Sequence, residues 1–174
     1  RVRLHVCYGN WEGPHIHDIP LAKILPALYQ ANVGALSIEF ANPRHAHEYP
    51  ALKQVPFPQD MILIPGVVET TSNFVEHPEV VADRLIRVAD AVGDPQRVIA
   101  GTDCGFDTSA GIGDVAPSLV WEKLRALRED TEGFESGGED ELRDERERLR
   151  HVTELAEGAA AAAEALAPDE GEGA

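Results

Sequence analysis

The sequence has little lysine and little cysteine, and it contains no long apolar run. Only three of its 15 basic residues are lysines, against 31 acidic residues, so the formal net charge is −16. Because phosphate binding needs a basic surface, this charge excludes nucleic acid as an expected partner. No stretch reaches the roughly 18 apolar residues of a transmembrane helix, so we expect no membrane partner.

The two cysteines, Cys7 and Cys104, are too few for a disulfide framework. Free thiols favour a reducing compartment, so we expect a cytoplasmic protein; the alternative is one disulfide between the two residues. The chain opens directly on a strand pattern, without an initiator Met, signal peptide or N-terminal helix, and we expect it to be part of a longer protein. Its acidic, lysine-poor composition also favours a halophilic, salt-adapted source.

The negative charge is concentrated at one end. Residues 1–128 contain 15 acidic and 11 basic side chains, net −4, whereas residues 129–174 contain 16 acidic and 4 basic ones, net −12. A glycine-containing, strongly charged segment has little apolar surface to bury. We therefore predict a folded domain over 1–128, followed by an acidic linker and tail over 129–174 that is disordered or loosely helical.

Short apolar runs alternate with helical patterns over residues 1–128. Strands are predicted at 2–7, 35–40, 61–68 and 97–102, and helices at 18–31, up to 52, at 78–92 and at 116–127. Asp18 is the predicted N-cap of the first helix, and Gly93 the predicted stop of the third. Four such βα units predict an α/β fold with parallel strands, half of a TIM (β/α)8 barrel. Because a half barrel leaves open sheet edges, we expect missing upstream strands or a second copy to complete it.

Residues with metal-ligand side chains stand at the ends of three predicted strands. His5 and Cys7 are two positions apart on an extended segment, so their side chains leave the same face. Glu39 ends the second strand, and Cys104 follows the fourth. Each residue alone is consistent with an ordinary core or surface position. Since a parallel barrel gathers its carboxyl strand ends at one face, their joint placement favours a site for Zn²⁺.

This set of ligands indicates a particular chemistry. Two thiolates, one carboxylate and one imidazole place excess negative charge around a metal, which keeps a bound sulfur electron-rich. Such a zinc ion would activate a thiol rather than generate hydroxide. The expected partner is therefore a thiol substrate.

Asp103 and His15 are the candidate catalytic residues. Asp103 precedes a predicted ligand and could orient His5 or contact substrate, but it could equally cap a loop. His15 lies in the loop after the first strand and could carry protons, although loop histidines are commonly solvated. The weaker candidates for proton transfer are the other loop histidines, His17, His45, His47 and His77.

Four segments within residues 2–128 resemble the C-terminal catalytic barrel of the cobalamin-independent methionine synthase family. They are His5-Val6-Cys7-Tyr8-Gly9-Asn10, Ile38-Glu39, Pro65-Gly66-Val67 and Thr102-Asp103-Cys104-Gly105-Phe106. The resemblance implies the C-terminal half of a TIM barrel, with zinc held by His5, Cys7, Glu39 and Cys104. It also implies methyl transfer from a methylated folate to the sulfur of homocysteine.

Other segments resemble the short, single-barrel branch of this family, which includes enzymes that alkylate coenzyme M with epoxides. They are Trp11-Glu12-Gly13-Pro14-His15 and Asn73-Phe74-Val75-Glu76-His77-Pro78. Thr71 stands where the folate-dependent synthases have a proton-transferring His. The leading expectation is a methionine-synthase-like methyltransferase acting on homocysteine. The alternatives are an epoxide-to-coenzyme M transferase of the same fold and a non-catalytic, zinc-binding barrel remnant.

Overall fold

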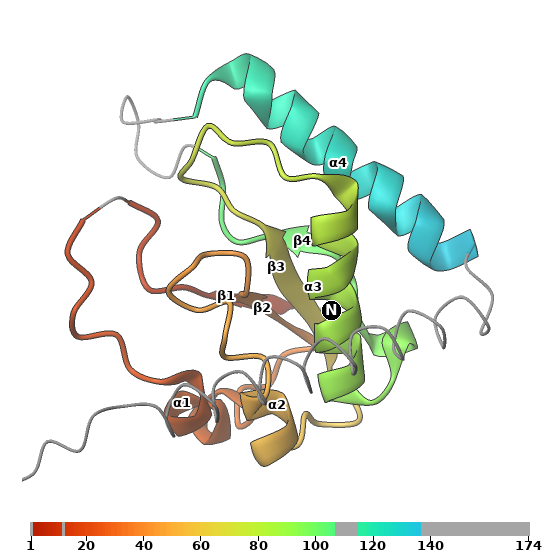
Figure 1. The fold of residues 1–174 in the computed structure, drawn as a ribbon. Helices are drawn as coiled ribbons and strands as arrows, with labels where there is room; N and C mark the ends of the chain where they lie inside the picture. The colour runs from red at the N-terminus through yellow and green to blue at the C-terminus, as the bar shows by residue number, and fades with distance from the viewer. Residues whose placement is uncertain (1, 12, 107–114, 137–174) are drawn as a thin grey trace, which may run out of the picture. The chain divides into compact units, whose positions relative to one another are not determined.

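Strands and helices alternate along the chain in the computed structural model, which describes residues 2–11, 13–106 and 115–136 (Figure 1). The strands are β1 (Arg3–Val6), β2 (Ala35–Glu39), β3 (Ile62–Val68) and β4 (Gly101–Thr102). The helices are α1 (Leu21–Leu28), α2 (Ala51–Gln54), α3 (Pro78–Val92), the 3-10 helix η1 (Pro95–Arg97) and α4 (Pro117–Ser136). This alternation confirms the predicted α/β class.

The four strands form one parallel sheet in the order β1-β2-β3-β4. In the register of this sheet His5 lies beside Ser37, and Glu39 lies beside Gly66. Parallel strands in sequential order, joined through helices, are the repeating arrangement of a TIM barrel. The parallel strands are thus confirmed, and completion of the barrel stays a prediction.

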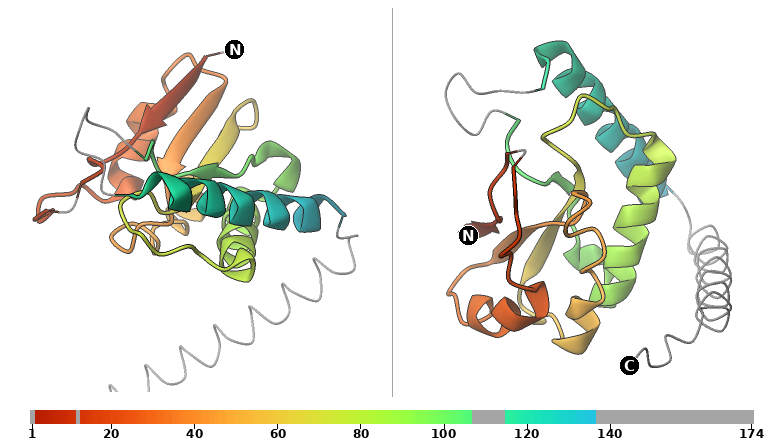
Figure 2. Two further views of the ribbon diagram at one scale, coloured as in Figure 1. Left: turned by 90° about the horizontal axis from the view of Figure 1, so that it is seen from above. Right: turned by 60° about the vertical axis from the view of Figure 1, so that its left-hand side comes forward.

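The two faces of the sheet differ in burial. Leu36 and Leu63 are fully buried and belong to a core cluster with Leu25 of α1 and Val88 of α3. Side chains that alternate with these core residues, such as Ser37, are more exposed. Two turned views of the ribbon show the strands side by side, with the helices next to them (Figure 2). One face therefore carries the core, while the other is more exposed and carries both polar and apolar side chains, such as Ser37 and Ile64.

The ends of α3 follow the sequence signals. Pro78 lies in its first turn, and the side chain of His77 accepts a hydrogen bond from the N–H of Glu79 as an N-cap. Gly93 ends the helix with a φ of +79°, a conformation in which glycine avoids the steric cost of a Cβ. His77 therefore has a structural role at a helix start.

The start of α1 corrects the sequence prediction for Asp18. The helix begins at Leu21 after Pro20, and no side chain of the capping residue makes a cap hydrogen bond. Instead, Oε1 of Glu48 accepts the N–H of Leu21 at 2.8 Å. A carboxylate from a distant loop thus satisfies a free N–H of the first turn, and Asp18 is available for other contacts.

The fourth strand is shorter than predicted. Asp94 accepts the N–H of Gln96 and pairs with Arg97 at 3.2 Å. Arg97, at the start of the predicted strand, therefore belongs to η1 instead. Val98 still bridges to Leu63 in parallel fashion. Helix α4, in contrast, continues beyond the predicted linker start at residue 129.

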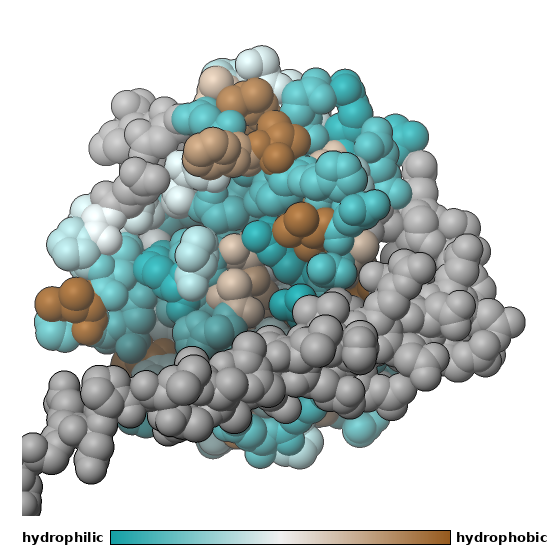
Figure 3. Space-filling view, in the orientation of Figure 1, coloured by the Kyte–Doolittle hydropathy of each residue, from teal (hydrophilic) through white to brown (hydrophobic). Residues whose placement is uncertain are grey.

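The chain divides into a unit over Arg1–Gly133, which contains the sheet, and a second over Phe134–Ala174. The predicted tail from residue 137 onward lies outside the described residues, and the boundary between 128 and 129 stays a prediction. None of the helices in the described part is both long and apolar enough to cross a membrane. On the face shown in Figure 3, the described surface is mostly hydrophilic, with small separate groups of hydrophobic residues.

Candidate metal centre

His5, Cys7 and Cys104 meet at the carboxyl ends of β1 and β4. One ligand atom from each lies within 4.8 Å of the other two, and Sγ of Cys104 is 3.4 Å from Nε2 of His5. Strands β1 and β4 are at opposite edges of the sheet, so this meeting requires a strongly curved sheet. The structure therefore brings together three of the four predicted ligands, which could hold a metal ion.

Glu39, the fourth predicted ligand, adjoins this group. The thiol of Cys104 donates a hydrogen bond to Oε1 of Glu39 at 3.2 Å. Glu39 is only 2% exposed, and its Oε2 is buried without a hydrogen-bond partner among the described residues. A buried carboxylate oxygen without a partner is costly, and a bound cation would remove this cost.

The imidazole of His5 is oriented by its neighbour in the sheet. Nδ1 of His5 is 3.2 Å from Oγ of Ser37, the residue beside it in the register. When Ser37 accepts this hydrogen bond, the proton resides on Nδ1 and the lone pair of Nε2 faces Cys104. A metal ion requires this free lone pair.

Burial raises the pKa of the Cys104 thiol, and the hydrogen bond to Glu39, the charge of Glu39 and the nearby Cys7 raise it further. Crowded acidic groups hold their protons unless a cation offsets the repulsion between their ionised forms. An imidazole, two thiols and a buried carboxylate with an unsatisfied oxygen therefore fit a zinc-type ion.

Asp103 contacts backbone groups rather than His5. Its Oδ1 accepts the N–H groups of Phe40 and Ala41, each at 3.0 Å, and its Oδ2 accepts the N–H of Asn42 at 2.7 Å. Burial raises the pKa of Asp103 to about 7, although the three N–H groups act to lower it. Of the roles predicted for Asp103, loop capping is the one that these contacts match.

His15 lies on the wall of a cleft of about 550 Å³ beyond the carboxyl ends of the strands. Its Nε2 is 3.3 Å from the carbonyl oxygen of Trp11, and its Nδ1 is 3.5 Å from Asp18. Other residues lining this cleft are Trp11, Ala41, Arg44, Thr71, Phe74 and Arg84. In the described part of the chain, no hydrogen bond or ion pair joins His15 to the His5 cluster, so its role in catalysis stays a prediction.

The charged side chains of the cleft have partners within the protein. Arg44 pairs with Asp18 at 2.8 Å, and Arg84 lies 3.5 Å from Glu76. The carboxylate of Glu69 accepts N–H groups from the loop that follows it. Trp11 and Phe74, in contrast, are 56% and 83% exposed. The cleft thus combines compensated charges with exposed aromatic surface, which suits an uncharged group.

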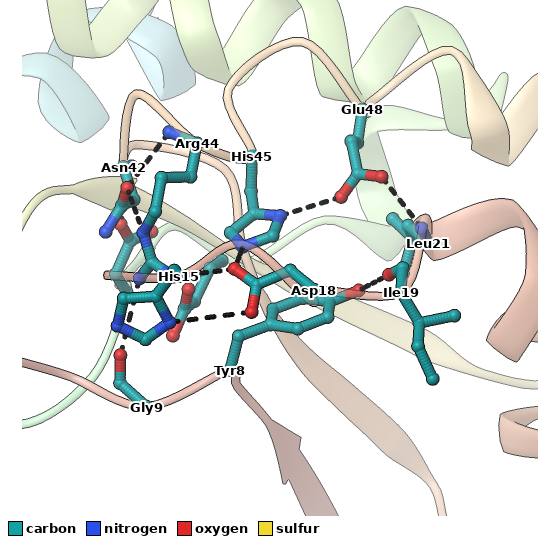
Figure 4. A network of polar contacts seen from close by, with 12 residues as sticks. Tyr8, Gly9, His15, Asp18, Ile19, Leu21, Asn42, Arg44, His45 and Glu48 are labelled. Atoms are coloured by element: carbon teal, nitrogen blue, oxygen red, sulfur yellow. Dashed lines mark hydrogen bonds and ion pairs between the residues drawn. The ribbon is translucent and has the colours of Figure 1, made fainter. Parts of the chain in front are cut away.

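A polar network that the sequence analysis missed links the loops after β1 and β2 (Figure 4). His45 is buried between two carboxylates, with Nε2 3.2 Å from Asp18 and Nδ1 2.9 Å from Glu48. The ring of Tyr8 stacks on that of His45 at 4.0 Å, and Arg44 joins the network through Asp18. Burial raises the pKa of Tyr8 to about 12. The run of histidines near residue 45 was the only sequence signal.

Lys123 is a second residue that the sequence analysis did not single out. Its side chain is fully buried, and Nζ donates to the carbonyl oxygen of Glu69 at 3.1 Å and to Glu76 at 2.8 Å. These contacts tie α4 to the segment between β3 and α3. In the sequence, Lys123 lies among the apolar residues of a predicted helix. A lysine at such a position commonly packs its methylene groups against its neighbours and keeps its amine in water, so burial of the whole side chain was not predicted.

The comparisons with known proteins identify a family and two similar proteins. The family described as the catalytic domain of cobalamin-independent synthase matches residues 1–119. The chain is 26% identical over 157 residues to 2-hydroxypropyl-CoM lyase of Xanthobacter autotrophicus, covering 75% of this chain and 40% of that protein.

A solved B12-independent methionine synthase from a Shewanella species, in complex with selenomethionine, matches with a TM-score of 0.50 and 20% identity. This match covers 75% of the present chain and 37% of the synthase, and it shows a shared fold. The chain therefore spans less than half the length of both similar proteins.

Proposed function

Because the chain belongs to the cobalamin-independent synthase catalytic domain family, we propose that it acts as a zinc-dependent thiol S-alkyltransferase. The observation that carries the proposal is the cluster of His5, Cys7 and Cys104 beside the buried, partly unsatisfied carboxylate of Glu39. We propose these four side chains as the zinc ligands. Their nitrogen, sulfur and oxygen atoms form a set that favours thiol activation over hydroxide formation.

When bound, zinc supplies the positive charge that lets a substrate thiol lose its proton near neutral pH. The residues of the chain form the site that would hold this charge. Ser37 orients the imidazole of His5, and the surrounding core keeps Glu39 away from water. Cys7 is exposed, whereas Cys104 is buried, so a substrate would approach from the side of Cys7.

The curvature of the sheet supports a barrel architecture. His5 and Cys104 come from the two edge strands and still approach to 3.4 Å. We propose that a complementary half barrel pairs along the open edges of β1 and β4, because unpaired edges expose backbone hydrogen-bonding groups.

Methyl transfer to homocysteine, as in methionine synthases, is the leading candidate reaction. The thiol loses its proton, its sulfur forms a new bond to the methyl carbon, and the bond between that carbon and its carrier breaks. The electron pair of the broken bond stays on the carrier, and the carrier or the solvent takes up the proton. The cleft that His15 lines would accept the part of the donor that carries the methyl group. The proposal is supported by the ligand set and by family membership.

Opening of an epoxide by coenzyme M is a second candidate, favoured by the charge compensation of the cleft. In this reaction the thiolate sulfur bonds to an epoxide carbon, the carbon–oxygen bond breaks, and the oxygen takes a proton. His15 is placed on the cleft wall and could supply that proton. A zinc-binding remnant without turnover is the remaining alternative.

The test is a crossed assay with the zinc-loaded full-length protein. Homocysteine or coenzyme M is combined with methyl-folate, methylcobalamin or a short epoxide, and loss of free thiol is followed. We expect turnover with one pair, and loss of that turnover in Cys104→Ser but not in His47→Ala, which changes an exposed loop histidine. Bound zinc without thiol consumption by any pair would contradict the transferase and support the remnant.

A further inference from the structure

Asp103 connects the ends of the two strands that carry Glu39 and Cys104. It directly precedes Cys104, and its two carboxylate oxygens accept the backbone N–H groups of the three residues that follow Glu39, at 2.7 to 3.0 Å. Asp103 is 3% exposed. Three hydrogen bonds of this length in a buried site hold the backbone on both sides.

Gly66 allows this connection to form across the sheet. Strand β3 lies between β2 and β4, so the carboxylate of Asp103 must pass over β3 to reach β2. A Cβ on Gly66 would stand 2.1 Å from Oδ1 of Asp103 and 2.5 Å from its Cα. In the register Gly66 lies directly beside Glu39. The missing side chain at Gly66 therefore provides the space that the carboxylate occupies.

We propose that Asp103 is a positioning residue for the metal centre, which sets the separation of Glu39 and Cys104 by holding the backbone after Glu39. This inference rests on the proposed function in one respect, that a metal binds at this site. Both oxygens of Asp103 accept backbone N–H groups, and among the described residues no hydrogen bond or ion pair joins them to His5 or Cys7.

The geometry requires a carboxylate of this length. An Asn has one acceptor oxygen, so its NH₂ group would face the N–H of Asn42, which lies 2.7 Å from Oδ2. A Glu side chain is longer by one methylene group, so its carboxylate would not fit in the space above Gly66. Either change should shift the backbone that carries Glu39.

The experiment compares Asp103→Asn with Asp94→Asn in the full chain. Asp94 provides a matched control because it also accepts a backbone N–H, that of Gln96 at 3.0 Å, but it precedes β4 rather than following it. Zn²⁺ affinity is measured by competition with a chelator, and the Co²⁺-loaded protein is examined by its thiolate charge-transfer and d–d absorption. Hydrogen exchange reports on the amides of residues 40–42, and thermal unfolding reports on stability.

We expect Asp103→Asn to weaken Zn²⁺ binding by about 10- to 100-fold, the range seen when a group supporting a ligand is lost. Its Co²⁺ spectrum should change, and the amides of residues 40–42 should exchange faster. Asp94→Asn should lower stability without altering the Co²⁺ spectrum or the Zn²⁺ affinity. A merely structural Asp103 would behave like Asp94, with lower stability and an unaltered metal spectrum.

If the parent chain binds zinc and Asp103→Asn binds it with equal affinity and an identical Co²⁺ spectrum, the positioning role is wrong and the proposed function stands. If the parent chain binds no metal, both are wrong. Should Asp103→Asn fail to fold, Asp103→Glu keeps the charge and is measured in its place, with the same weakened binding expected.

Discussion

The thiol of Cys104 lies 3.2 Å from Oε1 of Glu39, although the two residues are 65 positions apart in the sequence. Their strands, β4 and β2, are not neighbours in the sheet. The contact exists because a curved parallel sheet gathers its carboxyl ends, and it places a thiol and a carboxylate where both can bind one cation.

Replacement of both Cys7 and Cys104 by Ser should abolish metal binding. The parent protein is expected to contain about one zinc ion per chain, because thiolates supply two of the proposed ligands. Metal content is measured by mass spectrometry of the purified proteins. His47→Ala, at an exposed position, should keep its zinc. Full zinc occupancy in the double Cys variant would show that Cys7 and Cys104 are not metal ligands.

His15→Ala should lower the rate of the proton-requiring step, by about 10²- to 10⁴-fold if His15 acts as the general acid. The ring lies on the cleft wall, beside Trp11 and Asp18, and is thus within the region proposed to hold the alkyl donor. The measurement is the pH dependence of kcat/KM with the active thiol and donor pair. His17→Ala, which changes an exposed neighbour, is the control. An unaltered pH–rate profile would remove His15 from the mechanism.

Gly66→Ala should lower the free energy of unfolding by about 1–3 kcal/mol, the usual cost of overpacking a filled region. The added Cβ would meet the Cα of Asp103 at 2.5 Å, and backbone atoms cannot move away as a flexible side chain can. Urea denaturation measures the effect. Gly105→Ala is the matched control, since a Cβ there meets nothing within 4 Å. Equal stability of the two variants would contradict the tight contact at Gly66.

Lys123→Met should destabilise the protein by about 3 kcal/mol, because it leaves the partly buried Glu76 carboxylate with weaker compensation. Nζ of Lys123 is 2.8 Å from Glu76, and the lysine side chain is fully buried. Chemical denaturation is again the measurement, with Lys53→Met at an exposed position of α2 as the control. If both substitutions cost the same, the ion pair does not hold α4 in place.

Glu69 should make the stability of the protein depend on pH in the acid range. Burial alone would raise the pKa of Glu69, but hydrogen bonds from Thr71 and Ser72 outweigh it and hold the pKa below the usual Glu range. Because the folded-state pKa is the lower one, this stabilisation is present above the unfolded pKa of about 4.3 and is lost as pH falls through the folded value.

The stability difference between the parent protein and Glu69→Gln should therefore be largest near neutral pH and shrink towards strongly acidic pH. Denaturant titrations at several pH values measure this difference. Glu79→Gln changes a carboxylate that is 92% exposed and should give little difference at any pH. A stability difference that grows on acidification would contradict a lowered pKa of Glu69.

Local rules were sufficient for the order of the elements and for the placement of His5 and Cys7. His5 and Cys7 are two positions apart, and the period of a strand places them on one face whatever the rest of the fold does. Pro78 and Gly93 marked the ends of α3 because a fixed φ and a positive φ are properties of single residues. These features depend on the backbone nearby, so they could be read from the chain itself.

The partners of the buried carboxylates were decided by the tertiary structure. Asp18 was predicted as a helix cap but pairs with Arg44 and His45, and Asp103 binds the backbone after β2, 61 to 63 positions away. A carboxylate can accept from any N–H group that lies near it, so its sequence neighbours do not determine its partner. Which donors lie within 3 Å depends on how the parallel strands bring distant loops together, and only the assembled sheet determines that.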